Sequence, residues 1–269
     1  MPIDAVTLLS AVDRQALRYA HDLLEHPGLA ARLTGLIGLP IEKAMDMLPE
    51  RWAEAVAVST RKSLETALRV ALGTLDGRPR SRSRDLGHKF AVAATGVGGG
   101  AFGLAGLPVE LPISTTLMLR SIADVARSEG EDLATPESQM ACLEVFALGG
   151  RSGADDASDS SYFVVRAALA RSISEAAAYI AQRGLVEEGA PVLVRFVAQV
   201  AARFGGTVVQ KVAAQAVPIV GAAGGGTVNV LFMDHFQQMA RGHFIVRRLE
   251  RLYSPEVVRE AYAAIASRA

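Results

Sequence analysis

The densest polar cluster beside an uncharged stretch of this chain lies between Asp234 and His243. Asp234, Gln238 and Arg241 are spaced i, i+4, i+7, so they would share one face of a helix. His235 and His243 are eight residues apart and would lie roughly on one side, as a two-histidine metal site requires. No HExxH spacing accompanies them, so we favour a buried structural network and assign no metal ligand.

Glu110 is the second residue that could do chemistry. It follows a stretch, residues 90–109, that contains no charged side chain. A buried carboxylate needs a cationic partner or it takes up a proton, and the candidate partners are Arg120, Arg241 and His243. Alternatively, Glu110 lies at the start of a helix and is stabilised by the backbone dipoles there, which is the interpretation we favour.

Two further charge patterns have simple interpretations. Arg120 and Asp124 are spaced i, i+4 on one expected helix and are predicted to pair. Four arginines alternate with other residues in a Pro- and Ser-containing stretch that we interpret as a solvated loop or as a contact for anionic lipid headgroups: Arg78, Arg80, Arg82 and Arg84.

Motifs for catalysis are scarce. A hydrolase could be built on Glu110, His235 and His243 only if the fold brought them within hydrogen-bond reach of one another. The chain has no G-x-S-x-G elbow, and Cys142 lies among apolar residues, as inert core cysteines do. Gly98, Gly100 and Gly103 match G-x-G-x-x-G in spacing, but no strand pattern precedes them. We therefore assign no catalytic residue and no cofactor.

The composition predicts the elements that must position these residues. Of 269 residues, 50% are hydrophobic and only 6% aromatic, which favours closely packed helices over sheets. The 28 basic and 28 acidic residues balance, so no global field points to a nucleic-acid partner. We predict one all-α, multi-helical domain of about ten helices, with residues 1–88 as a helical lead-in and 89–269 as the core. Expected helices include residues 3–25, 50–75, 112–129, 136–149, 162–183, 191–204, 234–252 and 255–267.

Two glycine-rich runs without charge, residues 90–109 and 212–233, are each long enough to span a bilayer if helical. We interpret each as an apolar helical hairpin at the centre of the domain. Three arrangements stay open: a buried soluble core, a peripheral or re-entrant contact with one leaflet, and a true span. A cavity between the runs could alternatively hold a lipid or another apolar ligand, lined by Phe90, Phe102, Leu104, Val220 and Phe232. No signal peptide is apparent at the N-terminus, which predicts a cytoplasmic location.

Two segments carry a family resemblance. Residues 96–132 (GVGGGAFGLAGLPVELPISTTLMLRSIADVARSEGED) and 219–251 (IVGAAGGGTVNVLFMDHFQQMARGHFIVRRLER) resemble the central and C-terminal signatures of the EcsC family. The family takes its name from the third member of a bacterial operon that also encodes an ABC transporter. The resemblance implies a membrane-associated accessory protein at the inner face of the membrane, with membrane lipid and a transporter-type protein as partners. It implies no reaction.

Overall fold

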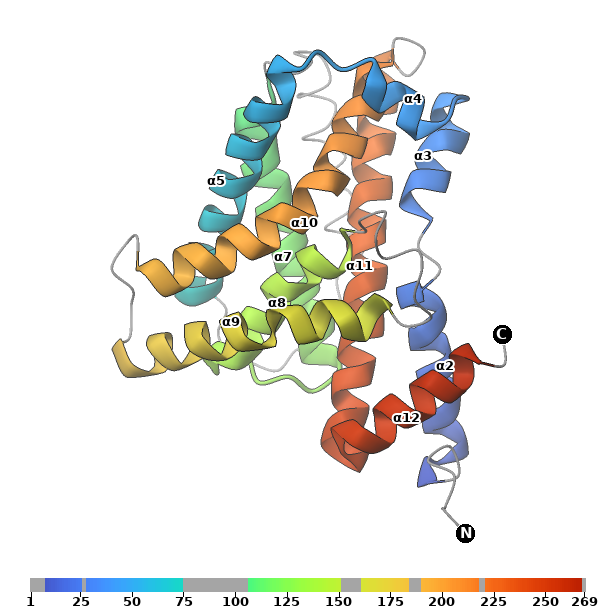
Figure 1. The fold of residues 1–269 in the computed structure, drawn as a ribbon, viewed down its shortest axis with the longest axis vertical. Helices are drawn as coiled ribbons and strands as arrows, with labels where there is room; N and C mark the ends of the chain where they lie inside the picture. Colours follow the sequence, from blue (N-terminus) through green and yellow to red (C-terminus); the bar gives the residue numbers. More distant parts are fainter. Residues whose placement is uncertain are drawn as a thin grey trace.

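The structure is a computed structural model that describes residues 8–25, 28–74, 106–150, 161–183, 190–217 and 221–267. These residues form helices and no strand, which confirms the predicted all-α domain. Their helices, labelled as in Figure 1, are α2 (Ala11–Glu25), α3 (Leu29–Ile37), α4 (Ile41–Asp46), α5 (Arg51–Thr74), α7 (Leu107–Ser128), α8 (Pro136–Leu148), α9 (Ser161–Arg183), α10 (Pro191–Ala216), α11 (Gly221–Tyr253) and α12 (Pro255–Ala266).

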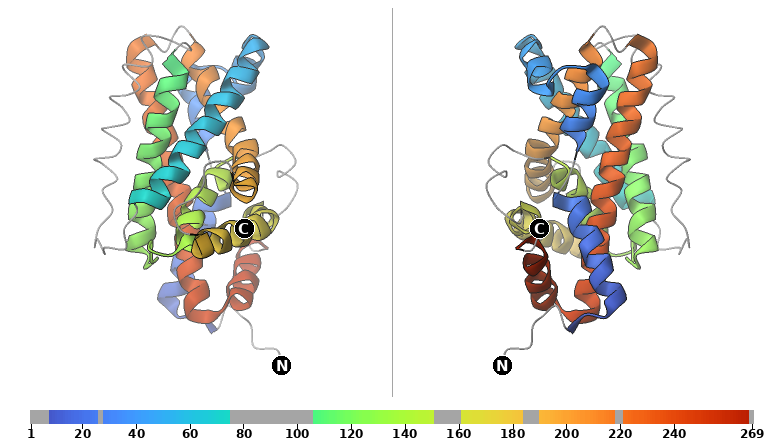
Figure 2. Two further views of the ribbon diagram at one scale, coloured as in Figure 1. Left: turned by 90° about the vertical axis from the view of Figure 1, so that its left-hand side faces the viewer. Right: turned by 90° about the vertical axis from the view of Figure 1, so that its right-hand side faces the viewer.

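The 33-residue helix α11 runs along the long axis of the molecule, and the other helices pack around it. α7 lies beside α11, and α5 packs on α7, as both views of Figure 2 show. α2 packs along the half of α11 that leads to its C-terminus, while α9 runs across the long axis and contacts α8 and α10. The helices that contact α11 directly are α2, α3, α7, α8, α10 and α12.

Four phenylalanines form the centre of the core, where α8, α10 and α11 meet. Phe146 and Phe204 have ring centroids 5.0 Å apart, and Phe236 lies 5.4 Å from both. Phe232 extends the cluster towards the start of α11, 5.1 Å from Phe236. All four rings are fully buried, and their contacts join these three helices.

Two glycines allow helices to approach more closely than any side chain would permit. A Cβ at Gly242 in α11 would lie 2.6 Å from Leu24 Cγ of α2. A Cβ at Gly150, just after α8, would lie 2.2 Å from the backbone oxygen of Arg203 in α10. Close packing, and not backbone flexibility, explains why these positions are glycine.

Two helix starts confirm the sequence interpretation. Thr135 precedes Pro136 and its side chain accepts a hydrogen bond from Ser138 N at 3.4 Å. Ser254 precedes Pro255 and accepts one from Val257 N at 3.5 Å. In both cases a hydroxyl satisfies an unpaired N–H of the first turn, and proline occupies a position that needs no N–H.

Three boundaries differ from the expected ones, each time because helix continues through a predicted break. α7 begins at Leu107, more than one turn before the expected start, and contains Pro112, which cannot donate the i→i−4 backbone hydrogen bond at that position. α10 continues through Gly205 and Gly206 to Ala216, because Phe204, Val208 and Val212 maintain one buried face across them. α11 begins at Gly221, so the second uncharged run divides between the end of α10 and the start of α11.

Candidate functional site

Glu110 belongs to a fully interior polar cluster, the Glu110–Lys211–Asn229 clasp, that joins α7, α10 and α11. The Glu110 carboxylate oxygen Oε1 accepts hydrogen bonds from Lys211 Nζ at 2.7 Å and from Asn229 Nδ2 at 2.9 Å. The Lys211 side chain has no exposed surface, and its ammonium lies 5.1 Å from the ring centroid of Phe232. Gln215 Nε2 donates to Asn229 Oδ1 at 3.4 Å and completes the cluster.

The clasp corrects the expected partners of Glu110. The cation is Lys211, not Arg120, Arg241 or His243. The favoured interpretation also holds in part, because Glu110 lies in the first turn of α7, where backbone dipoles stabilise a carboxylate. The sequence did hold a signal for Lys211: it is the last charged residue before the second uncharged run, as Glu110 is the first after the other.

The expected pair of Arg120 with Asp124 is replaced by a pair one turn along. Asp124 Oδ1 accepts a hydrogen bond from Arg127 Nη1 at 3.0 Å, and both side chains are buried. Arg120 is exposed on the outer face of α7. The buried i, i+3 partner is preferred because an interior carboxylate gains more from an interior cation than from one in solvent.

The polar residues at 234–243 are distributed around α11 and do not converge on one point. Asp234 accepts hydrogen bonds from Arg32 of α3 and, as its i, i+4 spacing predicts, from Gln238 Nε2 at 2.9 Å. His235 Nε2 lies 2.9 Å from the carbonyl oxygen of Gly149, which ties α11 to the end of α8. Arg241 lies half-buried on the face that also carries Asp234.

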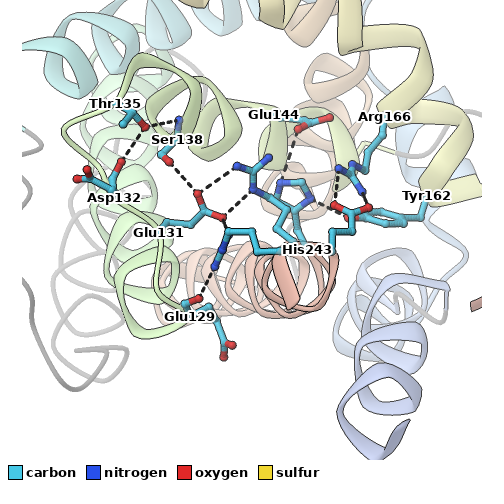
Figure 3. A network of polar contacts seen from close by, with 12 residues as sticks. Glu129, Glu131, Asp132, Thr135, Ser138, Glu144, Tyr162, Arg166 and His243 are labelled. Atoms are coloured by element: carbon cyan, nitrogen blue, oxygen red, sulfur yellow. Dashed lines mark hydrogen bonds and ion pairs between the residues drawn. The ribbon is translucent and has the colours of Figure 1, made fainter. Parts of the chain in front are cut away.

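His243 lies at the junction of α8, α9 and α11, in the network of polar contacts drawn in Figure 3. Its Nδ1 is 3.0 Å from the hydroxyl of Tyr162, and its Nε2 is 3.6 Å from Glu144 Oε2. Burial raises the pKa of Glu144 to about 7 and lowers the pKa of His243 well below its usual value. Arg166 of α9, bonded to both carboxylate oxygens of Glu250 at 2.7 and 3.0 Å, borders the junction.

A second network, which the sequence did not reveal, fixes the segment between α7 and α8 to the end of α11. The carboxylate of Glu131 accepts hydrogen bonds from Arg247 Nε at 2.9 Å, from Ser138 Oγ at 2.7 Å, and from Arg251. The backbone oxygen of Glu129 accepts a hydrogen bond from Arg251 Nη2 at 2.7 Å (Figure 3). The carboxylate of Glu129 accepts one from Arg248 Nε at 2.8 Å. Burial works to raise the pKa of Glu131, but the hydrogen bonds and charge of Arg247 hold it below its usual value.

The geometry contradicts a hydrolytic centre made of Glu110, His235 and His243. Asn229, which is hydrogen-bonded to Glu110, precedes His243 by fourteen residues of the same helix. At a rise of about 1.5 Å per residue, that places the two ends about 21 Å apart along α11. Each of the three residues instead contacts a different structural partner, so they cannot act on one substrate.

Metal binding finds no support in the described ranges either, since they hold no group of three His, Cys, Asp or Glu side chains placed to bind an ion. The arginine ladder, Arg78 to Arg84, lies outside the described residues, as do four of the residues proposed to line an apolar cavity: Phe90, Phe102, Leu104 and Val220. The fifth, Phe232, is part of the packed phenylalanine core.

Comparison with known proteins gives one result on identity. The model of the EcsC protein family matches residues 14–249, which is most of the chain. The chain belongs to the EcsC family. No curated protein and no solved structure matches it. The match includes the first segment on which the resemblance was based, all but the last two residues of the second, and all three members of the clasp. It also extends through the N-terminal helices.

Proposed function

We propose that this EcsC-family protein is a non-enzymatic accessory protein that works at the cytoplasmic face of the membrane. The proposal has two parts: one end of the helical domain contacts membrane lipid, and the protein serves a membrane partner of the transporter type. The partner is what the family resemblance implies, and the lipid contact is argued from the position of the described parts of the two uncharged runs, at the start of α7, the end of α10 and the start of α11.

The observation that carries the proposal is that both runs lead to the same end of the molecule. The first run ends in the first turn of α7, and the second includes the end of α10 and the start of α11. These three helix ends lie together in Figure 1, and the clasp joins them through Glu110, Lys211 and Asn229. We call this end of the domain the clasp end.

Apolar side chains face solvent beside the clasp. On the outer face of α7, Val109 is 68% exposed and Ile113 is 46% exposed, spaced i, i+4 so that they share one face. The next charged residue on that side is Arg120, about two turns further along. An apolar tip followed by a cation suits a helix whose end enters the headgroup region while its arginine stays at the surface.

A helix that spans the membrane is the less supported hypothesis. Among the described helices, α10 is long and apolar enough to cross a bilayer, judged by length and composition alone. Its buried face packs on α4, α5, α8, α9 and α11, and core helices of soluble proteins pass the same test. We therefore propose peripheral contact through the clasp end, which leaves the helical domain intact.

Vesicle flotation tests the proposal. We expect the full chain to float with phosphatidylethanolamine/phosphatidylglycerol vesicles at low salt. Replacing Val109 and Ile113 together by serine removes apolar area worth about 1 kcal/mol per side chain, so binding should weaken roughly tenfold or more. Leu252→Ser is the matched control, because Leu252 is 63% exposed at the opposite end of α11. A chain that stays unbound at low salt, or one weakened equally by Leu252→Ser, contradicts the proposed lipid contact.

A further inference from the structure

Tyr162, His243 and Glu144 form a second buried polar cluster, separate from the clasp. All three side chains are buried, and they come from three helices: α9, α11 and α8. Tyr162 and Glu144 are each 3% exposed, and His243 is fully buried. Their arrangement nevertheless differs from that of the other buried pairs, because an ionisable carboxyl faces an imidazole nitrogen that makes no hydrogen bond with any described residue.

The hydrogen bond on the far side of the imidazole orients the ring. The Tyr162 hydroxyl and His243 Nδ1 are 3.0 Å apart, and the phenol keeps its proton because burial raises its pKa. We assign the hydroxyl as the donor to Nδ1, which places the hydrogen of the neutral ring on Nε2, 3.6 Å from Glu144 Oε2. When the Glu144 carboxyl carries a proton and the imidazole is neutral, none of the three side chains is charged, which the protein interior favours.

The charged groups beside Tyr162, His243 and Glu144 have partners of their own. From α9, Arg166 pairs with Glu250 of α11, and from α11, Arg247 pairs with Glu131. From α12, Tyr262 stacks on Tyr162 and donates its own hydroxyl to Glu25 of α2. The remaining titratable neighbours are His21 of α2, which lies against Tyr262, and Cys142 of α8. None of them supplies a hydrogen bond to the Glu144 carboxylate among the described residues.

We propose that Glu144 and His243 hold a single proton between them, and that its loss loosens the junction of α8, α9 and α11. Below about pH 7 the pair is neutral and the three helices pack without a buried charge. Above that pH the carboxylate ionises in the interior and competes with Glu250 and Glu131 for Arg166 and Arg247. The junction is then a pH-responsive joint within the domain, independent of the proposed membrane contact.

Proton counting gives the proposal a distinctive signature. The pKa of Glu144 rises from 4.5 in the unfolded chain to about 7 in the folded one, so this group stabilises the fold at acid pH and loses that contribution as pH rises through 7. The pKa of His243 falls below its unfolded value of 6.5, so this group contributes stability above 6.5 that is lost as pH falls. Between pH 4.5 and 6.5 the folded and unfolded pairs each hold one proton, and the two effects cancel.

Single substitutions should expose the two opposite effects. In Glu144→Gln the unfolding equilibrium constant should rise about tenfold for each pH unit below 6.5, relative to the wild type. In His243→Gln the unfolding equilibrium constant should fall about tenfold for each unit by which the pH is lowered from 7 to 5. The double variant should return to the wild-type slope. Tyr162→Phe, which removes the hydroxyl but no titrating proton in this range, is the matched control and should keep the wild-type slope.

Three measurements decide the proposal, each on the full chain. Urea unfolding at pH 5 to 8 gives the slopes, and single variants that run parallel to the wild type would overturn it. Nitrogen NMR of the wild-type imidazole needs no variant: we expect the Nε2-protonated neutral form at pH 6, and a cationic His243 at that pH would overturn the shared proton. For loosening, amide exchange in α8 at pH 8 should be at least severalfold faster in the wild type than in Glu144→Gln. Equal rates would show that the junction does not respond to the proton.

Discussion

Removing the carboxylate of Glu110 is the most direct test of the clasp. In Glu110→Ala, the ammonium of Lys211 keeps its interior position but loses an acceptor 2.7 Å away. The Lys211 side chain has no exposed surface, so water cannot replace that acceptor without opening the contact between α7 and α10. Asn229 Nδ2 also loses the oxygen to which it donates at 2.9 Å.

The expected cost follows from what is left behind. Breaking a buried ion pair by removing one partner costs about 3–5 kcal/mol, because an uncompensated charge remains in the interior. A domain of this kind is stable by about 5–15 kcal/mol, so the variant should lose a large part of its free energy of unfolding. The double variant Glu110→Gln/Lys211→Met removes both charges at similar volume and should recover most of the loss.

Urea unfolding followed by circular dichroism measures these differences, with a constant m-value as the sign that only stability has changed. Glu175→Ala is the control: it breaks the exposed pairs of Glu175 with Arg171 and Arg195, and should leave the free energy of unfolding unchanged. A loss below about 1 kcal/mol in Glu110→Ala, or a double variant no better than the single one, would refute a buried charge pair at this position.

Three further outcomes follow from the packing and the networks. Gly242→Ala should destabilise the protein by about 1–3 kcal/mol in urea unfolding, because its Cβ would be 2.6 Å from Leu24 Cγ and would push α2 off α11; an unchanged midpoint would contradict this close contact. Cys142 is buried, and burial raises its thiol pKa to about 12, so it should resist Ellman's reagent in the native protein and react fully in urea; rapid native labelling would contradict the packing of α8. The lowered pKa of Glu131 means that its stabilisation is present above pH 4.5 and lost as pH falls, so Ser138→Ala should cost about 1 kcal/mol at pH 7 and less at pH 3.5; equal costs at both pH values would argue against the bond from Ser138 to the ionised carboxylate.

The helices were predictable from local features, and the contacts between them only in part. Thr135 and Ser254 mark helix starts, because each side chain bonds to a backbone N–H three residues later. Such local contacts can be predicted from the sequence alone. Gly205 and Gly206 predict a break that does not occur, because tertiary packing of the buried face of α10 outweighs the weak helix propensity of glycine. The expected helix start at Pro112 was also wrong, because α7 begins at Leu107 and continues through the proline.

The members of the candidate site were identified, but their partners were not. Glu110 stands out because it interrupts a long uncharged stretch, yet Lys211 lies 101 residues away, and no local spacing connects the two. His243 was expected to lie in a polar network, whereas its contacts Tyr162 and Glu144 come from other helices whose register against α11 is fixed only by packing. The sequence predicted that Asp234 and Gln238 share one helix face, and in the structure they are hydrogen-bonded. Spacing along a helix can be read from sequence, but pairing between helices depends on the fold.

Labelling at the two ends of the molecule tests most directly whether the clasp end meets lipid. Ile113→Cys and Leu252→Cys each introduce one exposed thiol, and the buried Cys142 does not compete for the label. With an environment-sensitive fluorophore on each, we expect anionic vesicles to shift the emission to shorter wavelength at position 113 and to leave position 252 unchanged. Emission that is unchanged at both positions, or that shifts only at 252, would contradict the proposed contact between the clasp end and the membrane.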